Sequence, residues 1–409
     1  MSADVDNPRS DRTRVLIAGG GIAGLEALLA LSDLAGDRVE LTLVAPDPEF
    51  TYRPMIVDEP FSMVPAERHD LALIARDLGA NFLLAGLDEI SSEEHTAKLT
   101  DGSEVEYDAA LVCVGARTRP AYPSATTLRS WSEPIAIDVA LDQAASHPSR
   151  TIVFAVPPRI VWSLPLYELA MLSQRRAVER DLEIEFQIIT PEMRPLEVFG
   201  TVASKAVSEL LEVRGIHIKT GSSLLEEDGT FVTVPGRESV SAGSVVALPL
   251  LSGPKVSGLP GDSNGFIPID EHCEVLGVAD VFAAGDGIAF PVKQGGLGTQ
   301  QADAAAEMIA ARAGAAVDPQ PFRPILRGKL ITGVESLNLS SRAAGGGGEG
   351  VASMDYLWWP PKKVGGKYLA PFLAGTSHFE PEAPAHSLDV EVSFPLEWHS
   401  EPGTLDPQR

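Results

Sequence analysis

The sequence predicts an α/β fold with two Rossmann-like dinucleotide-binding units, the first divided around the second, and a C-terminal interface or capping region. Three observations predict this fold: a glycine turn between a strand and a helix near residue 20, a strand that ends in Gly-Asp near residue 286, and a strand–helix pattern between them. Alternating strands and helices are typical of a parallel sheet. The expected parts are residues 1–149 and 269–325 for the divided unit, 150–268 for the inserted unit, and 326–409 for the C-terminal region.

The first glycine turn stands in the context that a dinucleotide site requires. Residues 14–18 form an apolar strand, residues 25–31 form a helix, and residues 39–44 form a second strand. These elements make a βαβ unit of roughly thirty residues, in which the turn lies directly between strand and helix. The context therefore favours a nucleotide-binding loop over an ordinary glycine-rich turn.

Each glycine of this turn has its own expected task. Gly19 permits the tight turn, Gly21 lets a pyrophosphate approach the backbone, and Gly24 lets helix and strand pack closely. At the start of the helix, the N–H groups around Ile22 and Ala23 are expected to bind the phosphates.

The acidic residue that would bind the adenosine ribose is missing from its usual place. It is expected about where Ala45 stands, and the nearest acidic residue is Asp47, in a Pro-Asp-Pro loop. We therefore name Asp47 as the candidate for this contact.

A second segment, far along the chain, has complementary features. Residues 280–286 read as a strand that ends in Gly285 and Asp286, and a helix follows that runs to about residue 312. A carboxylate at a strand end can accept hydrogen bonds from hydroxyl groups, and the helix N-terminus, near Gln294 and Gly295, favours negative charge.

Together these segments resemble the two FAD motifs of the pyridine nucleotide-disulfide oxidoreductase superfamily, most of all sulfide:quinone oxidoreductases and type II NADH dehydrogenases. The likeness covers roughly residues 14 to 312. Three further stretches fit it: the Phe-Thr-Tyr-Arg-Pro loop at 50–54, the strand with Val-Gly-Ala at 108–116, and the Lys-Gln-Gly loop at 293–295.

The resemblance implies non-covalently bound FAD. It places Asp286 at the ribityl chain, Gly115 where the backbone approaches the dinucleotide, and Arg53, Pro54 and Lys293 near the flavin ring. A cation beside the ring would favour the reduced anionic flavin. Lys293 also has a plainer interpretation, as a solvated loop lysine.

The inserted unit departs from the pattern of an NADH-binding relative. A strand is expected at residues 150–156, and the sequence Glu-Leu-Ala is kept at 168–170, but Pro, Trp and Leu replace the glycines between them. Bulky side chains block close approach of the backbone, and proline removes N–H donors. We expect the fold to be retained, with strands near 183–189 and 216–219 and a helix at about 202–213, and NAD(P) binding to be weakened or lost.

Glu168 and its neighbour Tyr167 are the remaining candidate catalytic residues, beside Lys293. If the register of the family holds, Glu168 points towards the flavin and could relay protons or orient a substrate. Alternatively, Glu168 is a glutamate favoured by the dipole at a helix start.

The two cysteines of the chain are Cys113, inside an apolar strand, and Cys273. This number excludes a disulfide framework and a cysteine zinc site, and the eight scattered histidines indicate no metal site. Sulfide oxidation in the resembled branch needs cysteines that flank the flavin, but one such position falls near Val161 and Trp162. We interpret both thiols as structural, so the usual sulfide chemistry is not expected.

The composition bears on partners and location. The 409 residues include 57 Asp and Glu against 32 Lys and Arg, a formal net charge of −25, which disfavours nucleic acid as a partner. The first 13 residues lack a signal-peptide core, and no apolar stretch could span a membrane. A cytoplasmic protein is expected.

Beyond residue 313 the sequence changes character. A glycine-rich loop at 345–350 leads to an aromatic segment with three lysines at 356–373. This segment could form a peripheral membrane patch with quinone access, or cover the flavin or a homodimer contact. Its prolines and glycines favour the second interpretation. Residues 388–394 alternate like an edge strand.

Three functions remain open from the sequence. The first is an FAD-dependent oxidoreductase that passes electrons between a small-molecule donor and an organic acceptor, with a quinone as one candidate, without redox cysteines. The second is an NAD(P)H dehydrogenase of the type II kind. The third is a redox-inert FAD-binding scaffold.

Overall fold

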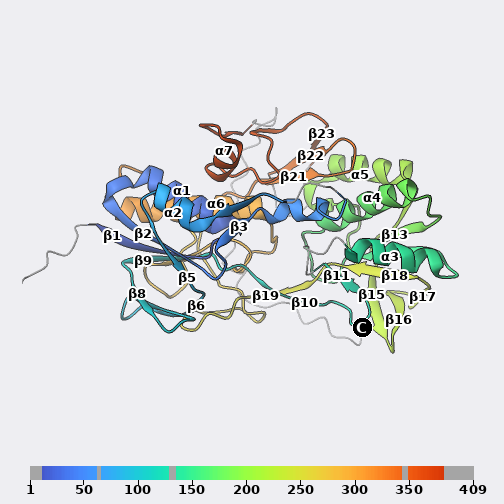
Figure 1. The fold of residues 1–409 in the computed structure, drawn as a ribbon, viewed down its shortest axis with the longest axis horizontal. Helices are drawn as coiled ribbons and strands as arrows, with labels where there is room; N and C mark the ends of the chain where they lie inside the picture. Colours follow the sequence, from blue (N-terminus) through green and yellow to red (C-terminus); the bar gives the residue numbers. More distant parts are fainter. Residues whose placement is uncertain (1–11, 62–65, 129–134, 343–348, 382–409) are drawn as a thin grey trace, which may run out of the picture.

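The computed structural model describes residues 12–61, 66–128, 135–342 and 349–381. Figure 1 shows three parts: two α/β units side by side, and a C-terminal region that lies across the helices of both. The expected strand at 388–394 and most of the expected loop at 345–350 fall outside the described residues.

The first unit is built on a five-stranded parallel sheet. Its strand order is β20-β9-β1-β2-β5, so a strand from residue 281 onward joins four strands from the first 112 residues. The strands are β1 (Thr13–Ala18), β2 (Val39–Ala45), β5 (Asn81–Leu84), β9 (Ala109–Val112) and β20 (Val281–Ala283). Because β20 pairs with β9 in parallel, the division of this unit around an insertion is confirmed.

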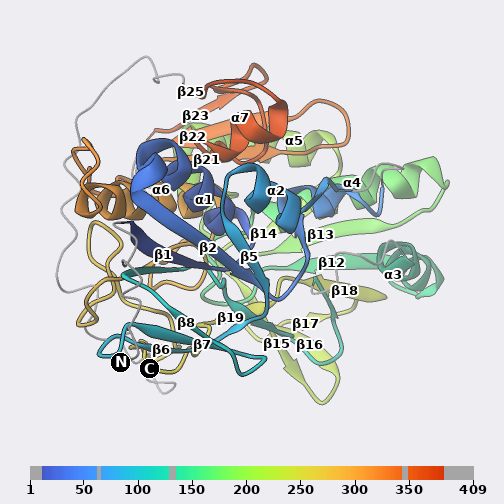
Figure 2. The ribbon, with the colours of Figure 1, turned by 60° about the vertical axis from the view of Figure 1, so that its left-hand side comes forward.

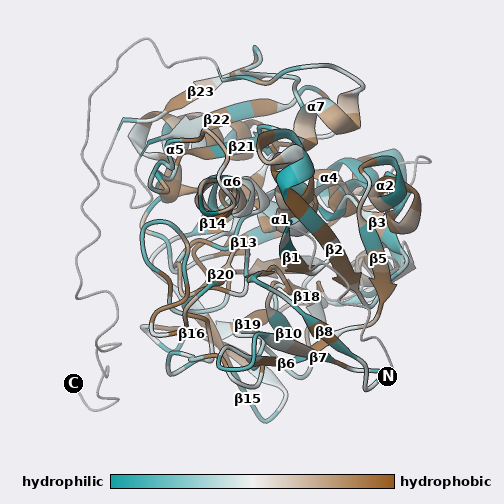
Figure 3. Ribbon diagram, turned by 90° about the vertical axis from the view of Figure 1, so that its left-hand side faces the viewer, coloured by the Kyte–Doolittle hydropathy of each residue, from teal (hydrophilic) through white to brown (hydrophobic). Residues whose placement is uncertain are grey.

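Two long helices, α1 (Ile22–Leu34) and α6 (Gly295–Arg312), pack against each other on one face of this sheet. Figures 1 and 2 place a small antiparallel sheet on the opposite side. Its strands are β6 (Leu87–Ser91), β7 (Thr96–Leu99) and β8 (Glu104–Glu106). Figure 3 shows mostly hydrophobic residues along β1 and β2, and the side chains of Leu16, Ile17 and Leu43 are buried there.

Short elements complete the first unit. They are η1 (Gly36–Arg38), β3 (Glu49–Thr51), η2 (Arg53–Asp58), β4 (Arg68–Asp70), α2 (Leu71–Asp77), and the pair β10 (Arg117–Arg119) and β19 (Leu250–Ser252). Asp70 caps α2 by accepting a hydrogen bond from the Leu73 N–H.

The middle unit has its own five-stranded parallel sheet, in the order β11-β18-β12-β13-β14. The strands are β11 (Thr126–Thr127), β12 (Thr151–Ala155), β13 (Glu185–Ile189), β14 (Ile216–Lys219) and β18 (Ser244–Ala247). The helices are α3 (Ile135–Ser146), α4 (Leu164–Glu179), η3 (Glu197–Phe199) and α5 (Thr201–Val213). An antiparallel sheet is formed by β15 (Ser223–Glu227), β16 (Thr230–Val234) and β17 (Ser239–Val240).

The expected boundaries of the middle unit, 150 and 268, need correction at both ends. Strand β11 pairs with β18, and α3 packs on β18 and β12, so the middle unit begins before residue 130. At the other end, Ser257 pairs with Glu89 of the first unit, so the chain has returned there by then. Sequence periodicity could not reveal these pairings, because the partners are more than 100 residues apart.

The C-terminal region joins the two units. Strand β21 (Leu326–Leu330) contacts both α4 and α6, and β23 (Val351–Ser353) contacts α5. The remaining elements are β22 (Leu337–Ser341), β24 (Trp358–Trp359), α7 (Leu369–Ala374) and β25 (Glu380–Pro381).

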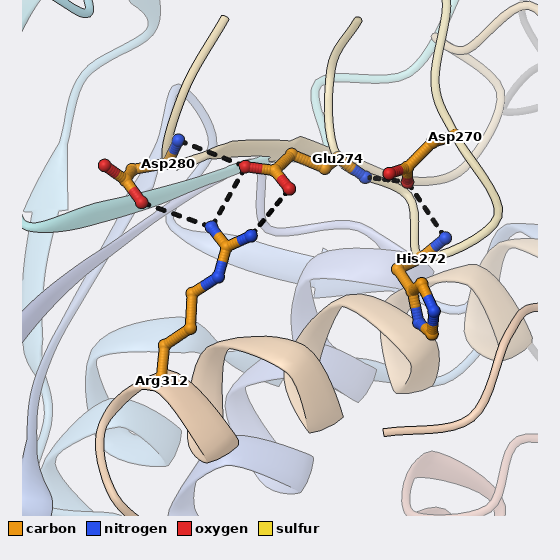
Figure 4. A network of polar contacts seen from close by, with 5 residues as sticks. All are labelled: Asp270, His272, Glu274, Asp280 and Arg312. Atoms are coloured by element: carbon orange, nitrogen blue, oxygen red, sulfur yellow. Dashed lines mark hydrogen bonds and ion pairs between the residues drawn. The ribbon is translucent and has the colours of Figure 1, made fainter. Parts of the chain in front are cut away.

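The far end of α6 is fixed to the sheet by a polar network (Figure 4). Arg312, the last residue of the helix, binds both carboxylate oxygens of Glu274 at 2.9 and 2.6 Å and contacts Asp280, directly before β20, at 3.1 Å. Asp270 in turn accepts hydrogen bonds from the backbone N–H groups of His272 and Glu274. A bidentate guanidinium–carboxylate pair restricts orientation, so the network holds the axis of α6 relative to β20.

Candidate functional site

The turn between β1 and α1 has a backbone that only glycine can adopt. Gly19 has a φ of +123°, and a Cβ there would lie 2.3 Å from the carbonyl oxygen of Cys113. A Cβ on Gly24 would lie 1.7 Å from the carbonyl oxygen of Gly19. The two glycines therefore bring strand, turn and helix into closer contact than any side chain allows.

The same turn leaves space where a ligand would need it. Apart from atoms of neighbouring residues in the chain, no heavy atom of the described residues lies within 4 Å of the place that a Cβ on Gly21 would take, and the same holds for Gly115, which follows β9 with a φ of +72°. Gly21 is the N-cap residue of α1, and no side chain caps this helix. Open backbone beside uncapped N–H groups fits a pyrophosphate.

The Gly-Asp segment after β20 lies directly against this turn. A Cβ on Gly285 would lie 3.3 Å from the Cβ of Ala23, and Gly298 of α6 packs against the same two residues. The side chain of Gln301 holds the segment by accepting a hydrogen bond from the Gly285 N–H at 2.9 Å. Two parts of the chain that are more than 260 residues apart therefore form one site.

Asp286 lies among positive charges from two other segments. Its side chain is half-buried, and desolvation raises its pKa, while the charges of Lys293 and Arg53 act in the opposite direction. Lys293 donates a hydrogen bond to the carbonyl oxygen of Ile288 and lies 3.7 Å from the ring centre of Phe266. Burial lowers the pKa of Lys293 to about 8, against the effect of Asp286. The plainer interpretation of Lys293, as a solvated loop lysine, does not fit this environment.

The remaining predicted contacts differ in their surroundings. The Gln294 side chain caps α6, since it accepts from the Leu297 N–H at 2.8 Å and donates to the Arg327 carbonyl at 3.0 Å. A Cβ on Gly295 would lie 2.9 Å from Ile22, so the first turns of α6 and α1 are in contact. Pro54 is half-buried at the start of η2. Asp47 is exposed in its loop after β2.

The middle unit has no comparable turn. Between β12 and α4, Pro157 is buried, Arg159 has a φ of +68°, and the indole of Trp162 packs edge-on against Phe199 at 5.6 Å between ring centres. Prolines and a packed indole thus stand where a dinucleotide-binding turn has glycines.

Tyr167 belongs to a buried cluster in this unit and not to an open site. Its hydroxyl donates to the carboxylate of Glu192 at 2.7 Å. The same carboxylate accepts from Ser163 and from Thr190, both at 2.8 Å. Burial raises the pKa of Glu192, and these hydrogen bonds oppose that rise. The tyrosine hydroxyl is therefore engaged within the protein.

Glu168 forms a buried ion pair with the C-terminal region. Its carboxylate lies 2.6 Å from the ammonium of Lys363 and accepts the Ile331 N–H at 2.9 Å. Both side chains are buried, Glu168 completely. Desolvation raises the pKa of Glu168 and lowers that of Lys363, and Asp58 of η2 adds its negative charge to the pair.

Lys363 is part of a segment that closes over the start of α1 and α6. The next residue, Val364, donates its N–H to the hydroxyl oxygen of Tyr52 at 2.7 Å, and its side chain contacts Gly295. Trp358 is buried, whereas Trp359 and Tyr356 are 45% and 53% exposed. The aromatic segment is therefore partly buried against the two helices and partly surface.

Both cysteines lie in the core. Cys113 is 7% exposed and Cys273 is not exposed. Burial raises the pKa of Cys113 to about 12 and that of Cys273 well above its ordinary value, so both are thiols at neutral pH.

Sequence reasoning missed three residues of this site region: Tyr52, Glu192 and Lys363. Tyr52 lies in the Phe-Thr-Tyr-Arg-Pro loop, but its hydrogen-bond partner, Val364, is 312 residues away in the sequence. Lys363 is one of three lysines in the aromatic segment, and this pattern is also typical of a surface patch. Only the fold shows that its ammonium is buried.

Comparison with known proteins shows which family this chain resembles. Residues 168–308 match the family model described as Pyridine nucleotide-disulphide oxidoreductase. The mitochondrial sulfide:quinone oxidoreductase of Dictyostelium discoideum is 21% identical over 313 residues, which cover 69% of this chain and 67% of that protein. The chain therefore resembles the pyridine nucleotide-disulphide oxidoreductase superfamily in sequence.

Solved structures of this superfamily share the fold. The sulfide:quinone oxidoreductase from Aquifex aeolicus superposes with a TM-score of 0.74 at 17% identity, over 83% of this chain and 86% of that one. NDH2 from Plasmodium falciparum, solved in complex with NADH, gives 0.55 at 15% identity, over 68% and 64%. The predicted fold class is confirmed, and the family indicates an FAD-dependent oxidoreductase, as the sequence predicts. None of the helices that the structure describes is long and apolar enough to cross a membrane.

Proposed function

We propose that this protein binds FAD non-covalently between the β1–α1 turn and the segment that follows β20, and passes electrons from a small organic donor to an organic acceptor, for which a quinone is the first candidate. The contact of Gly285 with Ala23 carries this proposal. It brings a strand-end carboxylate, the uncapped start of α1, the glycine-rich start of α6 and two cations to one place.

The residues present fit FAD in their chemistry. Gly19, Gly21 and Gly24 with the start of α1 would hold the pyrophosphate, and Asp286 would accept hydrogen bonds from the ribityl hydroxyls. When bound, FAD supplies an isoalloxazine that takes up and releases two electrons. Lys293 holds a positive charge beside Asp286 below about pH 8, which would favour negative charge on a neighbouring group.

The proposed donor is neither NAD(P)H nor sulfide. The middle turn offers side chains in place of open backbone, and its buried carboxylate is already bound by three hydroxyl groups. The two cysteines are buried thiols, and a thiolate is the reactive form for sulfur chemistry. The quinone acceptor rests on the names of the sulfide:quinone oxidoreductases that this chain resembles.

Glu168 and Tyr167 take positioning roles in this proposal. Both oxygens of Glu168 are bound, one by Lys363 and one by the Ile331 N–H, so the residue fixes the C-terminal region against α4. A buried charge pair is costly to break, which makes it a stable tie between the parts that meet at the proposed flavin site.

The test begins with the full-length protein. We expect yellow protein with FAD-type absorbance and, without oxygen, bleaching by dithionite but not by NADH, NADPH or sulfide within seconds. Bleaching by NADH would favour the type II dehydrogenase instead. Reduced protein should be reoxidised by a soluble quinone; failure of every donor and acceptor other than dithionite would favour a redox-inert scaffold.

One substitution links the colour to the site. Asp286→Ala should raise the Kd for FAD about tenfold or more, because a charged hydrogen-bond acceptor contributes about 1.5–3 kcal/mol. Asp77→Ala, at an exposed aspartate of α2, is the matched control and should bind FAD like the unaltered chain. Equal affinity in both variants would contradict the proposed site.

A further inference from the structure

Two cations on β21 have no acidic partner among the residues that the structure describes. Arg327 is only 8% exposed and Lys329 is half-buried, yet no carboxylate of the described residues pairs with either. The nearby lysines differ, because Lys363 pairs with Glu168 and Lys362 with Glu67 at 2.8 Å. In a chain with 57 acidic residues, this lack of pairing is notable.

Strand geometry places both cations on one face. Alternate residues of a strand point to the same side. Gly328, between the two, faces the middle unit, since a Cβ there would lie 2.5 Å from Phe199. Arg327 faces the other way, towards Gly365, and Lys329 donates to the carbonyl oxygen of Pro361 at 3.2 Å.

Aromatic rings surround these cations. The guanidinium of Arg327 lies 5.5 Å from the ring centre of Phe379, and the ammonium of Lys329 lies 5.7 Å from that of Tyr356. Burial lowers the pKa of Arg327 to about 10, so its guanidinium stays charged at neutral pH. A desolvated charge without an ion partner is unfavourable, and the aromatic contact offsets this cost only in part.

The pair adjoins the proposed flavin site. The carbonyl of Arg327 accepts a hydrogen bond from Gln294, the residue that caps α6. Gly365, against the Arg327 side chain, directly follows Val364, which contacts Gly295 at the first turn of that helix. Phe379, which contacts Arg327, is half-buried, and its neighbours in the sequence are exposed, so Arg327 lies close to the protein surface.

We propose that Arg327 and Lys329 recognise the carboxylate of an organic anion with an apolar body, and that this anion is the electron donor or acceptor of the reaction. The inference rests on the proposed function for the redox role alone. Arg327 presents a planar fork that matches a carboxylate, Lys329 adds a second charge, and the rings of Phe379 and Tyr356 suit an apolar body.

Calorimetry on the flavin-loaded protein tests the site, with benzoate, 2-naphthoate and succinate as probes and benzamide as the neutral control. We expect at least one carboxylate to bind, and benzamide to bind at least about tenfold more weakly. Arg327→Met should weaken carboxylate binding about 10- to 100-fold, the range for a hydrogen bond to a charged group. The carboxylate affinity of Arg327→Lys should lie between those of the unaltered chain and Arg327→Met. Arg38→Met, at an exposed arginine, should bind like the unaltered chain.

A second readout separates recognition from a structural role. Without ligand, Arg327→Met should unfold at the same or a higher temperature, because it removes an unpaired buried charge and keeps most of the apolar stem. A lower Tm would assign Arg327 to stability and overturn the proposal, as would a lack of Arg327-dependent binding by all three carboxylates.

The flavin itself reports on the redox role. Binding of the carboxylate should shift the visible flavin bands, and binding without a shift would overturn the assignment of the anion as a reactant. Protein that takes up no FAD would refute the proposed function, whereas calorimetry on that protein would still decide whether Arg327 binds carboxylates.

Discussion

The two α/β units begin in the same way and then treat the nucleotide position differently. In the first unit, β1 leads through three glycines into α1, and the backbone at Gly21 faces open space. In the middle unit, β12 leads through Pro157 and Pro158 into α4, and Trp162 packs against Phe199 where the backbone would be approached. Four strands have the same parallel order in both sheets, β9-β1-β2-β5 in the first unit and β18-β12-β13-β14 in the middle unit. The strand–turn–helix arrangement is therefore kept without the glycines, whereas the turn itself carries larger side chains.

The acidic residues after the second strands sharpen this contrast. In a dinucleotide-binding unit, an acid at this point binds the ribose. The first unit has buried Ala45 there, with exposed Asp47 two residues on. The middle unit has Glu192, three residues after β13, but Ser163, Tyr167 and Thr190 bind its carboxylate. In the middle unit, hydroxyl groups of the protein itself donate the hydrogen bonds that the ribose of a ligand would otherwise donate to this carboxylate.

The largest expected effect on FAD affinity comes from placing a larger side chain in the first turn, compared with placing a glycine in the middle turn. Gly24→Val should weaken FAD binding strongly, with a Kd raised by up to roughly 100-fold, because a Cβ there meets the Gly19 carbonyl at 1.7 Å and overpacking costs about 1–3 kcal/mol. Pro158→Gly, in the exposed middle turn, should change FAD affinity less than about twofold. Fluorescence titration of apoprotein with FAD measures both.

This pair of variants can break the comparison. If Pro158→Gly weakened FAD binding as much as Gly24→Val, the middle turn would belong to the flavin site. If Gly24→Val kept its flavin and its Tm, the first turn would not hold the pyrophosphate.

A smaller effect is expected inside the middle unit. Tyr167→Phe should lower the free energy of unfolding by about 1.5–3 kcal/mol, because the lost hydrogen bond leaves a buried carboxylate with one donor fewer. Tyr122→Phe is the matched control, since that hydroxyl donates to the neutral Leu224 carbonyl at 3.2 Å and should contribute about 0.5–1.5 kcal/mol. Urea unfolding of both variants measures the difference. Equal losses would argue that Glu192 is protonated and that its cluster is an ordinary set of neutral hydrogen bonds.

Local patterns predict several elements of the first unit. The glycine spacing and flanking apolar runs predict β1, α1 and β2 to within a few residues, and the Gly-Asp strand and its helix match β20 and α6. In the middle unit, the strand expected at 216–219 is β14, and the helix expected at 202–213 is α5. These signals are local, because turn glycines and hydrophobic periodicity act over a few residues.

Contacts between distant segments could not be predicted from these signals. The Glu168–Lys363 pair and the Tyr52–Val364 hydrogen bond span 195 and 312 residues, and no periodicity records them. The same limit explains why α3 and β11 were assigned to the first unit. Candidate residues on the glycine turns could be named from the sequence, whereas the surroundings of Lys293, Tyr167 and Glu168 required the fold.

The smallest expected effect tests how the first unit holds the C-terminal region. Glu26 of α1 accepts the N–H groups of Tyr368 and Leu369 at 2.8 and 2.7 Å, and so ties the start of α7 to the flavin-side helix pair. Burial raises the pKa of Glu26 to about 7, and burial beside Glu26 raises the pKa of Asp303 well above its ordinary value. Near neutral pH, Glu26 and Asp303 together therefore carry less than two negative charges.

The sign of the pH dependence follows from these raised values. Between its unfolded and folded pKa, Asp303 binds a proton in the folded state only, so its contribution to stability falls as pH rises through that window. Asp303→Asn removes this loss and supplies an amide donor for Glu26. We expect the variant to be more stable than the unaltered chain by about 1 kcal/mol at pH 8.5, with little difference at pH 5, as read from Tm at both values. A stabilisation of equal size at both pH values would show that the two carboxyl groups do not share a proton, and α7 would then be held by Glu26 alone.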